Sequence, residues 1–91
     1  MKQDHRYKSD IPNGATQKLV KKHREKRSSD GLTQVTYLRE EACLLNGAIV
    51  GKRFYDKEGV LCIEQPLKDK VLHGRVYYFS NGRLDLIEPY F

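Results

Sequence analysis

The sequence predicts an all-β protein: an antiparallel meander of repeated β-hairpins in a single sheet, preceded by a flexible N-terminal tail. Short polar turns that contain glycine recur along the chain, and the segments between them are rich in Val, Ile, Leu, Tyr and Phe. The second half of the chain also repeats itself every 23 residues. A period of this length is typical of arrays whose units bury their surfaces only against neighbouring units.

The first segment, residues 1–16, combines Pro12, Asn13 and Gly14 with scattered charges and has no hydrophobic periodicity. It is expected to be a flexible tail, and residues 17–91 are expected to form the only domain. A first strand is expected over residues 18–28. The composition there would also suit a helix, but Leu19 and Val20 are its only apolar residues before Arg27, so the sequence alone leaves strand or helix open.

Turn signals separate the remaining strands. Three short turns place glycine last, where a three-residue hairpin loop requires a positive φ, and Asn46-Gly47 is the signature of a two-residue type I′ turn. The structural turn positions are therefore Gly31, Gly47, Gly59 and Gly82, in Ser29-Asp30-Gly31, Asn46-Gly47, Lys57-Glu58-Gly59 and Ser80-Asn81-Gly82. Strands are expected at 18–28, 32–45, 48–56, 60–66, 71–79 and 83–88, joined in chain order.

The repeat becomes visible when the sequence is shifted by 23 residues. Identical residues then coincide without a gap: Gly51 with Gly74, Tyr55 with Tyr78, Gly59 with Gly82, Leu61 with Leu84, and Pro66 with Pro89. A third, degenerate copy is expected before these two, with Gly31 in place of Gly59.

These matched positions, together with the His73-Gly74 step and the Asn81-Gly82 turn, resemble the MORN repeat in its bacterial variant form. The resemblance covers residues 46–91. It implies β-hairpins stacked into one elongated sheet, and it implies a non-enzymatic protein–protein interaction module whose partner the sequence does not identify.

The net charge of +5 is concentrated at the N-terminus. Six basic residues fall within ten positions: Lys18, Lys21, Lys22, Arg24, Lys26 and Arg27. Such a run could contact the phosphates of a nucleic acid, and a nucleic-acid-binding protein of regulatory type is the alternative function. The resemblance to MORN variants implies that such a protein could be antitoxin-like. An anionic membrane surface is less favoured, and a solvated strand that keeps the protein soluble is the simplest interpretation.

Aromatic residues form the second candidate site. Phe54, Tyr55, Tyr77, Tyr78 and Phe79 are expected on adjacent strands, where they could form a partner-binding or dimer face, stack on bases, or only pack across strands. Alternation puts apolar residues on both faces of the sheet, so the sheet must curve over its own core, pack on a second copy or be covered by a partner. For so short a chain, a homodimer is expected.

Several classes of function are disfavoured. No nucleophile, base and orienting group recur at a fixed spacing, so neither enzyme activity nor a cofactor is expected. Cys43 and Cys62 lie among apolar neighbours and are expected to be core residues rather than metal ligands or a disulfide. The N-terminus lacks a signal peptide and no apolar run could span a bilayer, so the expected compartment is the cytoplasm.

Overall fold

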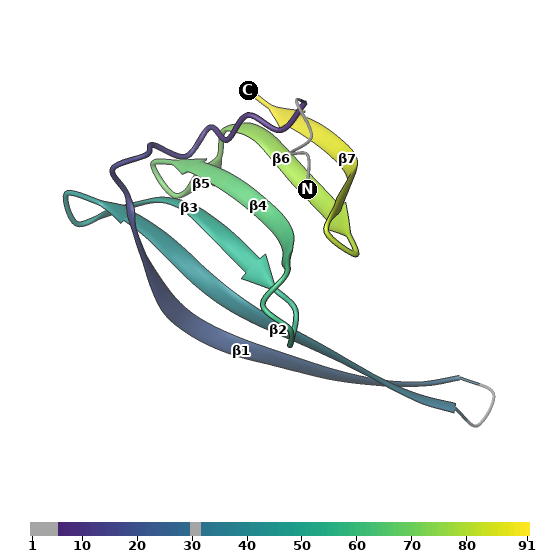
Figure 1. Ribbon diagram of the computed structural model, residues 1–91. Helices are drawn as coiled ribbons and strands as arrows, with labels where there is room; N and C mark the ends of the chain where they lie inside the picture. Colours follow the sequence, from purple (N-terminus) through teal and green to yellow (C-terminus); the bar gives the residue numbers. More distant parts are fainter. Residues whose placement is uncertain (1–5, 30–31) are drawn as a thin grey trace.

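The computed structural model describes residues 6–29 and 32–91, with the side chains of 24–37 excepted, and it is an all-β protein (Figure 1). The described residues form no helix. Seven antiparallel strands make one open sheet in the order β1-β2-β3-β4-β6-β7, with β5 paired to β4. Their bounds are β1 Thr16–Ser29, β2 Leu32–Leu45, β3 Ala48–Tyr55, β4 Leu61–Lys68, β5 Val71–Leu72, β6 Gly74–Ser80 and β7 Arg83–Tyr90.

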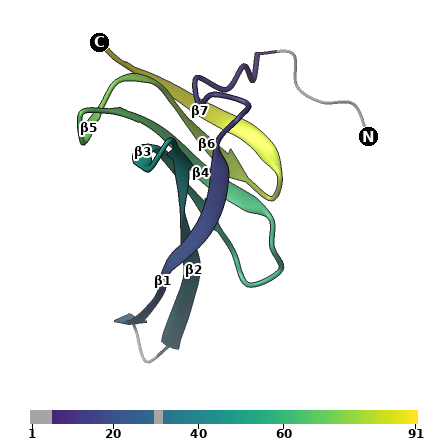
Figure 2. The ribbon, with the colours of Figure 1, turned by 90° about the vertical axis from the view of Figure 1, so that its left-hand side faces the viewer.

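The expected meander is confirmed, and the strands begin and end within two residues of the expected positions. β1 is a strand, which decides the alternative left open for residues 17–28. Only residues from Arg39 onward in β2 also pair with β3, so the outer part of the β1–β2 hairpin extends beyond the rest of the sheet (Figures 1 and 2).

The strand expected over 71–79 is interrupted at His73, and β5 and β6 are its two parts. The backbone N–H of His73 donates to the carbonyl oxygen of Pro66 at 3.1 Å, and Gly74 follows with φ of 116°. A side chain at Gly74 would be strained in this conformation, and its Cβ would lie 3.0 Å from both Pro66 and Asp10. The glycine therefore allows the strand to bend.

The Asn46-Gly47 turn has the two positive φ values, 52° and 81°, of the expected type I′ geometry. Asn81-Gly82 has the same geometry, and Ser80 pairs with Arg83. This turn has two residues rather than the expected three, because asparagine also tolerates the left-handed conformation. Gly31 lies outside the described residues.

The Lys57-Glu58-Gly59 loop is a three-residue loop as expected. Asp56 and Val60 bracket it through a 3.0 Å backbone hydrogen bond, and the Asp56 carboxylate accepts from the N–H groups of Glu58 and Val60. Gly59 has φ of 82°, and nothing lies within 4 Å of the place that a Cβ would take. Backbone conformation alone therefore requires glycine here.

Replacing Gly59 with valine is expected to lower the free energy of unfolding by about 1–2 kcal/mol, because a β-branched residue is strained at positive φ. Urea denaturation measures the effect. Glu58→Val is the matched control, since Glu58 is exposed in the same loop and has no positive φ. An unchanged midpoint for Gly59→Val would contradict this account of the loop.

The N-terminal segment differs from the expected flexible tail in one respect. Residues 1–5 lie outside the described part, and residues 6–15 form no strand, as expected. Residues 6–11, which we call the strap, nevertheless lie across the sheet (Figure 2), and Ile11 is only 4% exposed. Side-chain contacts with β3, β4 and β6 hold the strap there, and such contacts leave no periodic pattern in the sequence.

Candidate functional site

The two faces of the sheet differ in what lies over them. The face that carries Arg53, Glu64 and Tyr77, which we call the strap face, contacts the strap. Neighbouring residues along each strand point to the opposite face, which carries Phe54, Ile63 and Tyr78. The strap thus covers part of one face of the sheet. The sequence suggested a curved sheet, a second copy or a partner for this purpose, but not the N-terminal segment of the same chain.

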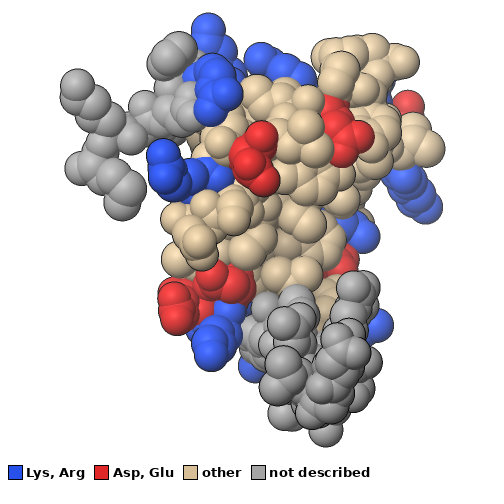
Figure 3. Space-filling view, turned by 90° about the vertical axis from the view of Figure 1, so that its right-hand side faces the viewer, with Lys and Arg blue, Asp and Glu red and all other residues tan. Residues whose placement is uncertain are grey.

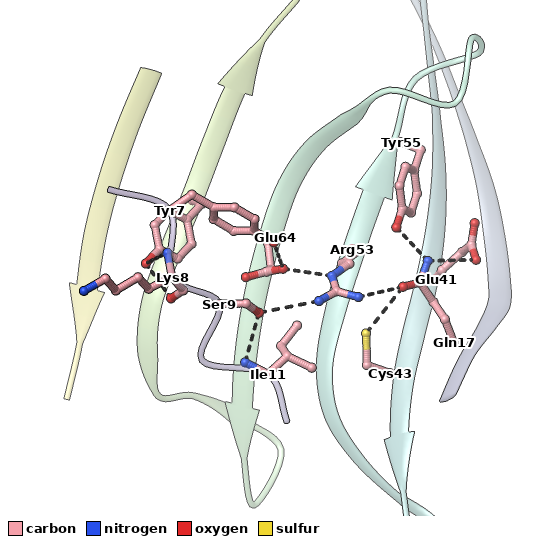
Figure 4. A network of polar contacts seen from close by, with 11 residues as sticks. Tyr7, Lys8, Ser9, Ile11, Gln17, Glu41, Cys43, Arg53, Tyr55 and Glu64 are labelled. Atoms are coloured by element: carbon pink, nitrogen blue, oxygen red, sulfur yellow. Dashed lines mark hydrogen bonds and ion pairs between the residues drawn. The ribbon is translucent and has the colours of Figure 1, made fainter. Parts of the chain in front are cut away.

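A buried carboxylate lies at the centre of the strap face (Figure 4). Glu64 is 0% exposed, and its Oε1 accepts from the Tyr7 hydroxyl at 2.6 Å and from Arg53 Nε at 2.8 Å. Its other oxygen, Oε2, is buried and has no hydrogen-bond partner among the described residues. A buried carboxylate requires a charged partner, and Arg53 is that partner.

The network continues toward β1 and β2 (Figure 4). Arg53 also donates to the side-chain oxygen of Gln17 at 2.9 Å. The Gln17 amide in turn donates to the Tyr55 hydroxyl at 2.7 Å and to Glu41 at 3.1 Å. Side chains from four strands and the strap therefore form one connected polar layer.

Two further contacts fix the strap over β6. The Tyr77 hydroxyl donates to the carbonyl of Lys8 at 2.7 Å and accepts from the Lys8 N–H at 3.1 Å. Asp10 forms a bidentate pair with the guanidinium of Arg75, at 2.6 Å and 3.0 Å, and accepts from the Arg75 backbone N–H at 2.8 Å. Charge-assisted, bidentate bonds are stronger than neutral hydrogen bonds, but solvent screens this pair, because Arg75 is 36% and Asp10 28% exposed.

Glycine makes room for the strap at two places. A Cβ on Gly51 would lie 2.5 Å from Ile11 Cδ1, and a Cβ on Gly74 would lie 3.0 Å from Asp10. These two glycines are the first pair matched by the 23-residue repeat. In this chain, the repeated glycine is a position at which a side chain on the sheet would collide with the strap.

The surroundings shift the pKa values of two strap groups in opposite directions. Burial, reinforced by the hydrogen bond to Glu64, raises the pKa of the Tyr7 hydroxyl. The hydrogen bonds from Arg75 hold the pKa of Asp10 below its ordinary value. Tyr7 therefore remains a hydrogen-bond donor and Asp10 an anion at neutral pH.

Acid is expected to weaken the strap. A depressed pKa in the folded state means that the Asp10–Arg75 pair stabilises the protein above the unfolded pKa of about 3.9 and is lost as the pH falls below it. Thermal unfolding between pH 7 and pH 2 should show this loss, with a smaller pH dependence in Asp10→Asn. Equal pH dependence in both proteins would contradict the expectation. Glu40, whose pKa is lowered by His23 and Lys52, accounts for part of the remaining dependence.

The aromatic residues expected on one binding face are divided between two. Tyr55, Tyr77 and Phe79 lie on the strap face, where the Tyr7 ring makes edge contacts with Tyr77 at 4.9 Å and Phe79 at 5.3 Å. Phe54 and Tyr78 lie on the opposite face. The division follows from the two-residue period of a strand, since Phe54 and Tyr55 are neighbours in β3, as are Tyr77 and Tyr78 in β6.

On the opposite face, four apolar residues form a row across four strands, which we call the apolar row. Phe54 pairs with Ile63, Ile63 with Tyr78, and Tyr78 with Leu86. The first three are half-buried and Leu86 is 49% exposed. On the side of the molecule that faces right in Figure 1, uncharged residues cover most of the surface (Figure 3).

The basic run lies along β1, an edge strand that pairs only with β2. Lys18, Lys21 and Lys22 are exposed. The register places Lys18 opposite Ala42 and Lys21 opposite Glu40, on the face of the apolar row, and Lys22 opposite Arg39 on the strap face. The side chains of Arg24, Lys26 and Arg27 are outside the described part. The described lysines are thus divided between two faces.

The described residues hold no group of three or more His, Cys, Asp or Glu side chains that could bind a metal ion. Both cysteines are free; Cys43 is buried, and burial raises the pKa of its thiol. A low-pKa, reactive thiolate is not formed at Cys43.

Sequence reasoning missed the strap residues Tyr7, Asp10 and Ile11 and the buried Glu64. One signal was available for Glu64, because it is the only charged residue between Leu61 and Leu67. Buried charges of this kind have a partner, which can be sought among arginines of neighbouring strands. For the strap, Ile11 is an isolated apolar residue in a polar segment and gives no periodic signal.

Comparison of the chain with protein-family models, with curated proteins and with solved structures gives no match. No helix in the described part of the chain is long and apolar enough to cross a membrane. The inference of function therefore depends on the two faces of the sheet.

Proposed function

We propose that the protein is a non-enzymatic protein–protein interaction module of the MORN-variant type, and that its first partner is a second copy of itself. The apolar row carries this proposal. Its four apolar side chains lie opposite one another on neighbouring strands, and they are partly exposed. The described contacts of the strap do not reach this face. A row of this kind is typical of an association surface. The hairpin meander is the architecture that the resemblance to MORN repeats implies.

The charges beside the apolar row favour a twofold arrangement. Lys18 and Lys52 lie beside the row at the β1–β3 end, where Lys52 Nζ already pairs with Glu40 Oε2 at 3.1 Å. Glu88 lies beside the row at the β7 end. A twofold axis parallel to the strands would place β7 of one copy over β1–β3 of the other. Lys18 of each copy would then lie near Glu88 of the other while the two apolar rows pack together.

Light scattering coupled to size exclusion tests the dimer. At tens of micromolar, the expected mass is about 21 kDa, twice the 10.6 kDa of one chain. Leu86→Lys is expected to give a folded monomer, because it places a charge in the apolar row. Val71→Lys is the matched control, since Val71 is 63% exposed in β5 and outside the row. A folded wild-type monomer, or equal masses for the two variants, would refute the arrangement.

Nucleic-acid binding is the competing outcome. Affinity for a nucleic acid would fall steeply with salt, with a slope of about −0.9 per neutralised phosphate for duplex and −0.7 for single strands. Labelled oligonucleotides titrated at two salt concentrations measure it. We expect no detectable binding at low salt. Salt-dependent binding that is lost when Lys21, Lys22, Arg24 and Arg27 are replaced with serine would favour the nucleic-acid function instead.

A further inference from the structure

We propose that the strap face is a peptide-binding site, and that the strap of the same chain occupies it in the structure. The partner would be an extended segment of another protein that carries the same residue types as the strap. These are a tyrosine, a carboxylate three residues after the tyrosine, and an aliphatic residue four residues after the tyrosine. In this chain these positions are Tyr7, Asp10 and Ile11. This site is on the other side of the sheet from the apolar row, so the proposal does not depend on the dimer.

The tyrosine position has the most specific contacts. The Tyr7 ring packs edge-on against Tyr77 and Phe79, and its hydroxyl donates to the buried Glu64 carboxylate at 2.6 Å. A phenylalanine in the same place would leave the buried Glu64 carboxylate with one hydrogen-bond donor fewer. The site therefore selects a tyrosine.

The next contacts hold the backbone and the acidic position. The Tyr77 hydroxyl binds both the N–H and the carbonyl of Lys8, which any residue type provides. Arg75 then holds Asp10 through two side-chain bonds and one backbone bond. The backbone contact fixes the position of a bound segment along the sheet. The bidentate arginine then selects a carboxylate two residues later.

The aliphatic position is defined by the shape of the sheet. Ile11 is buried over Gly51, where a Cβ on the sheet would lie 2.5 Å from it. The sheet thus provides binding positions for a tyrosine, for a backbone N–H and carbonyl, for a carboxylate and for an aliphatic side chain. They follow one another in the order in which an extended segment presents these groups.

The strap is held in a way that permits exchange. It pairs with no strand within the described residues, so the sheet ladder remains intact when the strap leaves. With the strap in place, Glu64 Oε2 is buried without a donor, which offsets part of the favourable contacts. A short turn, in which Ala15 N–H donates to Pro12 O, joins the strap to β1. The tethered strap competes at a millimolar effective concentration, so a partner binds well only when the strap is weakened.

The test uses a fluorescent peptide of residues 6–15 and full-length protein. In the Tyr7→Ala/Asp10→Ala chain, whose own strap has lost two anchors, fluorescence anisotropy should show saturable binding. Binding to the wild type should be at least about tenfold weaker, because the intact strap competes. Adding Arg75→Ala to the double variant should weaken binding about fivefold, and so should Asp10→Ala in the peptide, because the Asp10–Arg75 pair is partly exposed.

Two results would overturn the proposal: no binding at millimolar peptide, or binding that Arg75→Ala leaves unchanged. Circular dichroism verifies that each variant is folded, and Asp10→Asn, a milder change, replaces the double variant if that one unfolds. Leu86→Lys added to the double variant should bind the peptide normally, which separates this site from the dimer surface. If the strap of one copy instead binds the strap face of another, the chain with Leu86→Lys should have twice the mass of a monomer. The partner of the strap face would then be a second copy of this chain.

Discussion

Replacing Arg53 with methionine is expected to lower the free energy of unfolding by about 3 kcal/mol, as measured by urea denaturation. The substitution keeps most of the volume of the side chain but leaves Glu64 buried without its cation. Removing one partner of a buried ion pair typically costs about 3–5 kcal/mol, and Arg53 is 25% exposed, which places the effect at the lower end. Total stability of a domain of this size is only about 5–13 kcal/mol.

Two matched variants separate this effect from general loss of packing. Arg39→Met removes an arginine from a bond with Glu41 on the same face, but this pair is partly exposed, so about 1 kcal/mol or less is expected. The double variant Arg53→Met/Glu64→Gln removes both charges and should recover part of the stability. If Arg53→Met cost no more than Arg39→Met, the buried pair would not stabilise the fold.

A valine at Gly51 is expected to cost about 3 kcal/mol, also by urea denaturation. Its Cβ would overlap with Ile11, 2.5 Å away, and would press on the backbone oxygen of Gln65 at 3.0 Å. Displacing Ile11 gives up the burial of a whole isoleucine side chain, and overpacking adds strain in the sheet. Gly51 has no positive φ, so backbone conformation does not contribute.

A double-mutant cycle with Ile11→Ala identifies the cause. If the clash with the strap dominates, Gly51→Val should cost about 1 kcal/mol or less in the Ile11→Ala background, because the obstructing side chain is absent. Gly14→Ala is the control for glycine substitution as such, since its nearest neighbour, Leu45, would be at an ordinary 3.6 Å. An equal cost in both backgrounds would mean that the strap does not occupy this position.

The meander could be predicted from local chemistry. Asn46-Gly47 and Gly59 take the positive φ values that their types and positions indicate, and a two-residue turn fixes the register of the strands beside it. The 23-residue period matches Gly51 with Gly74 in the sequence. The turn inferences use residues that are close together in the sequence, and this explains their success.

The candidate sites depended on contacts between distant residues. Tyr7 meets Glu64 across 57 positions of sequence, and Asp10 meets Arg75 across 65. No spacing rule connects such pairs. The division of the aromatic residues between two faces, in contrast, follows from strand alternation at Phe54-Tyr55 and Tyr77-Tyr78 and could be predicted from the sequence.

Strand order in the sheet follows chain order, so each hairpin can form from residues that are near one another before the next hairpin is added. The strap contacts β3, β4 and β6, which lie far from it in the sequence, so its site exists only when these strands have come together. In refolding, the strap should therefore close last, after the sheet has formed. During that interval the strap face is uncovered. A nascent or refolding chain could then bind a peptide segment at the strap face, which the strap covers in the folded protein.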